Sequence, residues 1–563
     1  MFRETVRSGG AALLAALLAT LPGSPRAQPA DTLLLNGKIL TVDQDFSTRE
    51  ALAIRDGRVL ATGTTEAMRA LGGDGTRVVD LGGRTVIPGL NDSHIHAVRA
   101  AQTFAVEANW TGIPTLQQAL DRLREAAEHA PPGAWIIVAG GWMEIQFAEN
   151  RKPTQAEIVA AVPDHPVYIQ QLYEWLLLSP SAMEKLGIAA EADLPRPGKL
   201  VLGPDGRPTG EITGDALLMG ALFNKLPRPS FAQEVEGTRQ FFAEMNRLGV
   251  TGVIDPAGVS VPPASYRPVM RLWQDRELTM RVTYYLSSQQ PPGKELDDYR
   301  NLTQLLPAGF GDDMLRFGGI GEIVTWRAWT DNDPTPEAMA ELEAVLRWAA
   351  RERQGLQIHW NPNRSVGALL DMMEAVNRET PIGGLRWWIN HLHDASTENL
   401  RRMQRLGVAW SVQDSLYFSG GRYTAARGAE VAARSPPIRT ALEIGLHVAG
   451  GTDAHRVSSY NPFVALRWYL DGKTMDGRSV LGEAERISRE QALRLYTINA
   501  VWLARAENSR GSLEPGKYAD LAVLTADYAT VPVEEIGRIE SLLTLVGGHV
   551  VHAAGPFSAL AAR

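Results

Sequence analysis

Short apolar runs separated by tight-turn dipeptides occupy both ends of the chain. They are rich in Val, Ile, Leu and Thr, are broken by Asn-Gly, Asp-Gly or Gly-Gly, and lie in residues 31–43, 50–63, 76–90, 511–528 and 541–555. Such runs predict antiparallel hairpins, and each end alone is too small to bury a core. We therefore expect residues 28–86 and 506–563 to form one composite β-sandwich.

The middle of the chain, residues 87–505, alternates strand-like apolar runs with helical stretches. The strand-like runs lie in residues 134–142, 165–173, 249–258, 315–326, 356–360, 385–393, 407–413 and 445–455. Helical patterns separate them, as in residues 336–355 and in residues 396–407, which begin with Ser and end with Gly. Repeated strand-helix units over about 420 residues predict an α/β fold, a parallel (β/α)8 TIM barrel with insertions.

The first 27 residues form a different kind of segment. Arg3 and Arg7 precede an apolar run over residues 11–21, and small residues and prolines follow it. This arrangement is typical of a secretory signal peptide. The run is too short to span a hydrocarbon core of about 30 Å as a helix. We therefore expect a periplasmic or secreted protein without stable membrane insertion after the signal is removed.

Composition narrows the chemistry that such a fold can host. The 563 residues include 56 Lys and Arg against 64 Asp and Glu, a net charge of -8 that argues against nucleic acid as a partner. Cysteine is absent, which excludes disulfides, thiolate nucleophiles and Cys-ligated metals. Any metal must therefore be bound by His, Asp, Glu or a modified Lys.

Histidines and one aspartate lie near the carboxyl ends of the predicted strands. His94 and His96 are two residues apart, so on a strand they share a face. The later strand ends contribute His359, His391, His393, Asp453 and His455. In a parallel barrel these ends meet at one face. Neutral imidazoles with a carboxylate suit Zn²⁺ or another divalent ion.

Several motifs resemble the amidohydrolase superfamily, in particular its YtcJ-like or amidohydrolase-3 branch, which includes N-substituted formamide deformylases. The segments that carry the resemblance are NGKILTVD, VIPGLNDSHIH, GGWMEIQFAENRKPTQAEIVAAVPDHPVYI, GTDAHRVSSYNPF, LYTINAVWLA and GSLEPGKYADLAVL. Together they cover nearly all of the chain after the leader. The resemblance implies a TIM barrel beside a composite β-sandwich, with metal-dependent hydrolysis at the barrel mouth.

The resemblance also implies roles for individual residues. His94 and His96 match the ligands of the first strand, His359 that of the fifth and His391 that of the sixth. Asp453 matches the aspartate of the eighth strand, a metal ligand and the general base. We expect one or two metal ions per chain.

The fourth strand departs from the family pattern. Relatives with two metals often use a carbamylated lysine there, whereas this chain has Gly-Gly-Ile-Gly-Glu, with Gly321 at the lysine position. Glu322 could bridge two metals instead, but adjacent residues of a regular strand face opposite sides. A bulge at Gly318, Gly319 and Gly321 would be needed to turn it inward. A one-metal site remains the alternative.

Substrate contacts are expected from five further residues. Glu174 stands where relatives commonly have a histidine. It is either a carboxylate in a salt bridge near the mouth or a residue that changes substrate selection, with a cationic or hydrogen-bond-donating group facing it. Trp142 and Trp326 belong to a set of tryptophans near strand ends that would suit an apolar or aromatic group. His393 and His455 are interpreted as groups that contact the substrate or support the ligands.

The predicted function is hydrolysis of a non-peptide C–N bond by metal-bound hydroxide. The substrate is expected to be a small, apolar or aromatic amide, formamide, carbamate or cyclic amide. A deaminase of the same superfamily and a secreted metal-binding protein without activity are the alternatives. The sequence leaves the oligomeric state open, homo-oligomers included.

Overall fold

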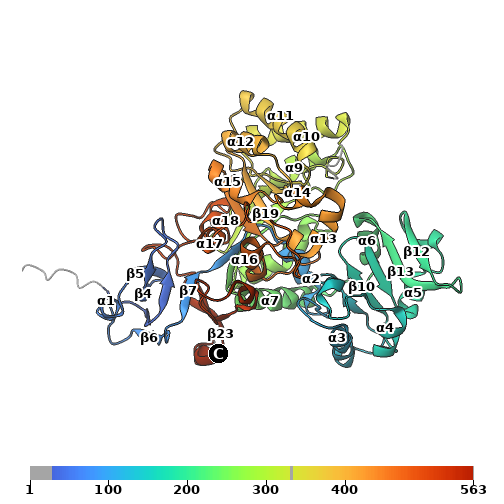
Figure 1. Ribbon diagram of the computed structural model, residues 1–563. Helices are drawn as coiled ribbons and strands as arrows, with labels where there is room; N and C mark the ends of the chain where they lie inside the picture. The colour runs from blue at the N-terminus through green and yellow to red at the C-terminus, as the bar shows by residue number, and fades with distance from the viewer. Residues whose placement is uncertain (1–27, 330–333, 562–563) are drawn as a thin grey trace, which may run out of the picture.

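The computed structural model describes residues 28–329 and 334–561. The expected signal peptide, residues 1–27, lies outside the described residues. Figure 1 shows three regions: terminal strands in blue and red, a teal region formed by residues of the first half of the chain, and a central body surrounded by yellow and orange helices. No helix in the described ranges is long and apolar enough to cross a membrane.

Two four-stranded parallel sheets form the central body. One has the order β16-β15-β14-β8, and the other β17-β18-β19-β20. The first contains β8 (Leu90–Asp92), β14 (Val250–Asp255), β15 (Arg281–Leu286) and β16 (Leu315–Ile320). The second contains β17 (Gln357–Trp360), β18 (Trp388–His391), β19 (Ala409–Gln413) and β20 (Val448–Gly451). Their parallel strands and intervening helices give the α/β, TIM-barrel-type fold that the sequence predicts.

Helices follow these strands. They are α2 (Ala97–Phe104), α7 (Phe231–Arg247), α8 (Arg267–Gln274), α9 (Glu295–Thr303), α10 (Pro336–Arg351), α11 (Asn363–Glu379), α12 (Thr397–Leu406), α13 (Ser415–Arg427), α15 (Ile438–Ile444), α16 (Pro462–Asp471), α17 (Arg489–Leu495) and α18 (Ile498–Leu503). The two helices expected near residues 336 and 396 are present. For α12, the Ser396 side chain accepts a hydrogen bond from the Asn399 N–H, and Gly407 ends the helix with φ +69°.

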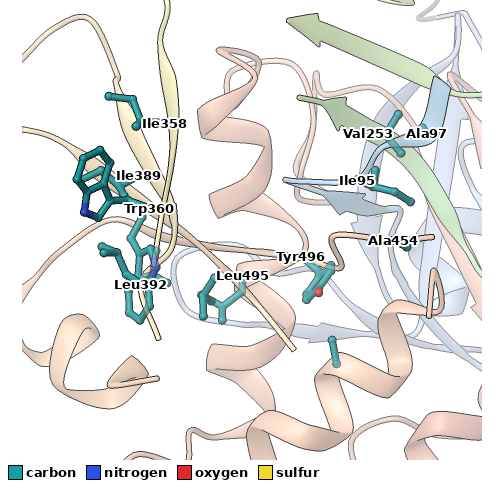
Figure 2. Close-up of a cluster of buried hydrophobic side chains, with 14 of the residues drawn as sticks. Ile95, Ala97, Val253, Ile358, Trp360, Ile389, Leu392, Ala454, Leu495 and Tyr496 are labelled. Carbon is teal, nitrogen blue, oxygen red and sulfur yellow. The ribbon is translucent and has the colours of Figure 1, made fainter. Parts of the chain in front are cut away.

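The largest hydrophobic cluster lies between the strands and these helices. Ile358 and Ile389 are paired neighbours on β17 and β18, and Figure 2 shows them with Trp360 and Leu392. On the opposite side of this view, Ile95 lies near Val253, Ala97 and Ala454. The apolar residues just beside His94 and Asp453 are thus fixed in the core, which holds the polar strand ends in place.

Residues from both ends of the chain share one sheet. Its order is β23-β22-β21-β7-β2-β3, with β2 (Lys38–Leu40), β3 (Thr48–Arg49), β7 (Thr85–Pro88), β21 (Leu521–Leu524), β22 (Ser541–Val546) and β23 (His549–Ala553). A second sheet has β1 (Thr32–Leu35), β4 (Ala51–Arg55), β5 (Arg58–Gly63) and β6 (Arg77–Asp80). One apolar cluster includes Leu34 and Leu52 of the second sheet and Val86, Leu521 and Leu543 of the first.

A separate five-stranded sheet follows α2 and forms the teal region of Figure 1. It contains β9 (Ile136–Val138), β10 (Val167–Gln171), β11 (Trp175–Leu178), β12 (Gly198–Leu202) and β13 (Pro208–Gly214), with helices α3 (Leu116–His129), α4 (Gln155–Ala161), α5 (Pro180–Leu186) and α6 (Ala216–Phe223). The runs at 134–142 and 165–173 therefore belong to an insertion and not to the central sheets. β8 and β15 occupy the places in the central sheets that the sequence pattern assigned to these two runs.

Candidate metal centre

The centre begins at the end of β8, where the chain leaves the core. The His94 backbone N–H donates to Asp92 Oδ1 (3.0 Å), and the His94 carbonyl accepts from the Asp453 N–H (2.7 Å). The imidazole of His94 is fully buried, and neither ring nitrogen has a hydrogen-bond partner among the described residues. A buried ring with an unpartnered nitrogen beside carboxylates is suited to a metal ion.

His96 is oriented by the backbone on its other side. Its Nδ1 donates to the Ala257 carbonyl at 2.8 Å, which leaves Nε2 facing Glu322 and Asp453. Burial and nearby Arg99 lower the pKa of His96, but hydrogen bonds to Asp453 and Glu322 outweigh them and raise it to about 9. The centre thus favours a positive charge, and a metal ion can replace the proton.

A bulge at the end of β16 places Glu322. Tyr284 and Tyr285 pair with Phe317 and Gly319, so one residue is skipped in the register. Gly319 and Gly321 have φ of +146° and +130°, and a Cβ on Gly321 would lie 2.1 Å from the Gln357 carbonyl oxygen. Only glycine fits there. The bulge that the sequence requires for an inward Glu322 is present.

Glu322 lies at the middle of the ligand set. Its Oε2 is 3.1 Å from His359 Nδ1, 3.4 Å from His391 Nε2 and 3.6 Å from His94 Nε2, and its Oε1 is 3.2 Å from His96 Nε2. Burial opposes its charge, but the surrounding histidines dominate and hold the pKa of Glu322 well below its usual value. One carboxylate therefore contacts all four histidines.

Asp453 follows β20 on the other side of the centre. Its φ of +56° turns the chain so that Oδ1 lies 3.5 Å from His94 Nε2 and 3.3 Å from His96 Nε2. Although burial opposes the charge, the neighbouring imidazoles of His94 and His96 lower the pKa of Asp453 below its usual value. Its side chain is 16% exposed and faces the cavity, whereas that of His94 is fully buried. Asp453 is thus an ionised carboxylate that a ligand can reach.

Two groups of ligand atoms are compact enough to hold an ion. One is His94, Glu322 and His391, and the other is His94, His96 and Asp453; within each group the ligand atoms lie within 4.8 Å of one another. His359 lies against the first group through Glu322. All six residues expected as ligands from the sequence are therefore brought together.

The centre opens into a cavity of about 730 Å³. Apolar and aromatic side chains form much of its wall, namely Met143, Leu172, Tyr173, Val259, Trp329, Phe418, Tyr423 and Val457. The Trp329 ring lies 6.3 Å from that of His359. Such a cavity has the size and lining of a small-molecule site.

Two of the five expected substrate residues line this cavity. His393 Nε2 lies 2.9 Å from Ser415 Oγ, and loss of solvation, with the neighbouring His391 and His359, lowers the pKa of His393 to about 3, so its imidazole is neutral. Glu174 stands at the mouth, where it is exposed and forms an ion pair with Arg422. The cation that faces Glu174 is therefore a side chain of the protein.

The other three lie outside the wall of this cavity. Trp142 is 1% exposed, packs on Trp110 with ring centroids 5.0 Å apart, and donates to the Gln170 carbonyl. It follows a strand of the insertion, so its ring fills that sheet's core. Trp326 donates to the Ser288 carbonyl, and His455 Nε2 is 3.0 Å from Glu107 Oε2.

Further residues line the cavity that the sequence did not single out as site residues, among them Arg99, Tyr173 and Asn361. Trp329, which belongs to the set of tryptophans near strand ends, lines it as well. Arg99 had a signal, because it follows His96 by one helical turn. Asn361, two residues after His359, lies with Nδ2 at 3.2 Å from His359 Nε2. Nothing in the residue types alone distinguishes Tyr173 and Trp329 from core aromatics.

A TIM-barrel-type fold with histidines and carboxylates at its strand ends is that of a metal-dependent hydrolase. The sequence profile of the Amidohydrolase family matches residues 77–552, so the chain belongs to this family. The predicted hydrolase of C–N bonds other than peptide bonds is confirmed by this membership. The family and the ligand groups together support a divalent metal cofactor and a small-molecule substrate.

Individual relatives cover nearly the whole chain. N-substituted formamide deformylase of Arthrobacter pascens is 26% identical over 92% of this chain and 98% of its own length. Putative amidohydrolase YtcJ of Bacillus subtilis is 22% identical over 92% and 98%. The crystal structure of an uncharacterized metal-dependent hydrolase from Pyrococcus horikoshii superposes with a TM-score of 0.64 at 20% identity, over 89% of this chain and 99% of that one. The expected YtcJ-like branch is confirmed.

Proposed function

We propose that the chain hydrolyses the C–N bond of a small amide, formamide, carbamate or cyclic amide with an apolar or aromatic group. One observation carries this proposal: six candidate ligand side chains, Glu322 among them, converge at the base of a cavity of about 730 Å³ with a largely apolar wall. The similarity to a formamide deformylase is consistent with it.

The donor set fits zinc or a similar divalent ion. Four imidazoles and two ionised carboxylates match its ligand preferences, and the unpartnered Nε2 of His94 belongs to both ligand groups. We propose one or two ions, which His94, His96, His359, His391, Glu322 and Asp453 would hold. When bound, a divalent ion lowers the pKa of a water and polarises the scissile carbonyl.

Residues of the chain carry out proton transfer, substrate orientation and water exclusion. Asp453 takes a proton from the attacking water as the new C–O bond forms and then returns it to the leaving nitrogen as the C–N bond breaks. Neutral His393, hydrogen-bonded to Ser415, orients the substrate. Trp329 and Tyr423 exclude water from its apolar part.

The proposal also covers how the sheets are arranged. We infer that the two parallel sheets close into one eight-stranded barrel. In support, the Ile320 N–H donates to the Gly355 carbonyl at 3.0 Å, and the Ser93 N–H donates to the Gly450 carbonyl at 3.0 Å. We also infer that the two terminal sheets pack as one β-sandwich, because one apolar cluster includes residues of both.

Export is proposed from the first residues. Arg3 and Arg7 before the apolar run at 11–21 support a cleaved signal and a periplasmic or secreted enzyme. Expression of the full chain in a Gram-negative host, followed by N-terminal sequencing of the periplasmic fraction, tests this. An intact N-terminus in the cytoplasmic fraction would contradict it.

The catalytic proposal is tested by metal content and by a panel of compounds. We expect one or two divalent ions per chain, release of an amine from an aryl amide or formamide, and loss of this activity with a chelator. Restoration by Zn²⁺ completes the test. A chain without metal would favour the non-catalytic alternative, and ammonia release from aminoheteroaromatic compounds would favour the deaminase.

A further inference from the structure

Two buried arginines lie beside the metal centre. Arg99 is 6% exposed and Arg456 is 5% exposed. Arg99 follows His96 by three residues in the first turn of α2, and Arg456 follows Asp453 by three residues after β20. Both guanidinium groups are therefore held by the same chain segments that present the candidate ligands.

Neither guanidinium has an anionic partner within residues 28–329 and 334–561. Arg99 donates one long hydrogen bond, from Nη1 to the Val259 carbonyl at 3.4 Å. The Nε atoms of both arginines are buried without a hydrogen-bond partner. Glu107, the carboxylate whose charge reaches Arg456, already accepts hydrogen bonds from Thr103 and His455. The donors of this pair are thus left available.

Aromatic rings surround the two cations but do not satisfy their donors. The Arg456 guanidinium carbon lies 4.0 Å from the centroid of the Phe223 ring and 6.0 Å from that of Tyr173, and Arg99 lies 5.6 Å from Tyr173. Cation–π contacts offset part of the cost of burial. A buried guanidinium still has five N–H donors to satisfy, and an unpaired buried charge is strongly unfavourable. The hydrogen-bond donors and charges of the two guanidinium groups are therefore satisfied only when an anion binds.

A second cavity contains this pair. It has a volume of about 250 Å³ and shares Arg99 with the cavity of the metal centre. Arg456, Arg228 and Arg267 also line it, and Glu234 is its one acidic lining residue within the part of the chain that the structure describes. Arg228 and Arg267 are exposed, so they attract an anion toward the buried pair. Four cations against one carboxylate select for a negative ligand.

We propose that this second cavity is a carboxylate-binding subsite, and that the substrate carries a carboxylate that contacts Arg99 and Arg456 while its C–N bond lies at the metal centre. This assignment rests on the proposed hydrolytic function. The planar fork of arginine binds a carboxylate through two parallel hydrogen bonds. N-acyl amino acids and related acids are the substrate class that combines such a group with an apolar acyl part.

The test compares matched substrates and variants. N-benzoylglycine and N-methylbenzamide share the acyl group and differ in the carboxylate. We expect Arg456→Leu and Arg99→Leu to lower kcat/KM for N-benzoylglycine by about 10- to 100-fold, and Arg456→Leu to change that for N-methylbenzamide by less than about threefold. Arg456→Lys, which keeps the charge and loses the fork, should give an intermediate loss.

Arg510→Leu is the control for removing a buried guanidinium. Arg510 is 6% exposed, also has unpartnered nitrogen atoms, and lines neither cavity. Arg510→Leu should leave the preference for N-benzoylglycine over N-methylbenzamide unchanged. Equal losses for both substrates in Arg456→Leu, or an unchanged preference, would overturn the subsite.

A binding measurement separates the subsite from the catalytic proposal. Calorimetry with 3-phenylpropionate, which has no C–N bond, should give a Kd that rises at least about tenfold in Arg456→Leu. If this holds and neither amide is hydrolysed, the subsite stands and the hydrolytic proposal fails. If phenylpropionate binds through Arg456 but does not compete with N-benzoylglycine, the cavity binds a separate anion, and the assignment of the substrate carboxylate is wrong.

Discussion

Nε2 of His96 lies 3.2 Å from Oε1 of Glu322, although the two residues follow the first and fourth strands of the parallel sheets. The same carboxylate lies 3.1 Å from His359 Nδ1 through its other oxygen. Glu322 thus occupies the middle of the site and places an anion between its four histidines.

Substitution Glu322→Gln tests this central position. The amide keeps the volume but removes the charge that faces four histidines, so we expect metal affinity to fall by at least about 10- to 100-fold and activity to fall with it. The measurement is metal content per chain after dialysis, with Zn²⁺ titration.

Glu337→Gln provides the matched control for this substitution. Glu337 is 72% exposed at the start of α10 and pairs with Arg327, so metal content should stay unchanged. Full metal occupancy in Glu322→Gln would show that Glu322 is a hydrogen-bond acceptor for the histidines and not a ligand.

Substitution Asp453→Asn separates proton transfer from metal binding. Five other ligand side chains remain, so we expect metal to stay bound, while kcat falls by about 10²- to 10⁴-fold because the proton acceptor is lost. Steady-state kinetics with parallel metal analysis measure both effects. Full activity of Asp453→Asn would exclude Asp453 as the general base, and loss of metal would reduce its role to that of a ligand.

The fold could be predicted from the sequence wherever short-range patterns decide it. Ser396 and Gly407 mark both ends of α12, and the turn dipeptides mark the terminal strands. The runs at 134–142 and 165–173 resemble barrel strands because any buried parallel strand is an apolar run. Their membership in the insertion depends on pairing between Ile137 and Tyr168, which local sequence does not encode.

The candidate site, like the fold, could be predicted from the sequence only in part. The histidine and aspartate ligands could be predicted because their spacing places them at strand ends. An inward Glu322 could be predicted only on the condition that the glycines before it form a bulge. Trp142 could not be separated from a substrate residue, since its burial depends on the insertion sheet. Arg456 stands out only in three dimensions, because the absence of an ionic partner among the described residues has no sequence signal.

The Glu174–Arg422 pair at the cavity mouth is predicted to have a small effect on activity with neutral amides. Both side chains are about half exposed, at 51% and 54%, so solvent screens the pair and it contributes less than about 1 kcal/mol. Glu174→Gln should change kcat/KM for a neutral amide by less than about threefold. A loss of about tenfold confined to amides with a cationic amine would instead show that Glu174 binds the substrate.

Asp520 links the terminal sheet to the central body. Its carboxylate forms a bidentate pair with Arg281 on β15, at 2.6 Å to Nε and 2.9 Å to Nη2, and accepts a hydrogen bond from the Gly547 N–H at 2.7 Å. Both side chains are almost fully buried. Asp520→Asn leaves the Arg281 charge without its partner, so we expect a loss of about 3–5 kcal/mol in the free energy of unfolding.

Asp527→Asn provides the comparison with a more exposed ion pair, which joins the N-terminal and C-terminal segments of the chain. The Lys38–Asp527 pair is about one-third exposed, so its loss should cost less than about 1 kcal/mol. Burial opposes the shift, but Lys38, Thr530 and Thr85 lower the pKa of Asp527 to about 2. Its contribution is therefore complete above the unfolded pKa of about 3.9 and is lost as the pH falls through about 2.

Urea unfolding of both variants, followed by circular dichroism, measures the difference. If the large effect of Asp520→Asn arises from an uncompensated charge, the double variant Arg281→Met and Asp520→Leu should recover at least about half of the lost stability, because no buried charge remains. Equal losses in the single and double variants would instead assign the effect to the hydrogen bond from Gly547. The terminal sheet would then depend on the orientation of the loop before β23 more than on the ion pair with β15.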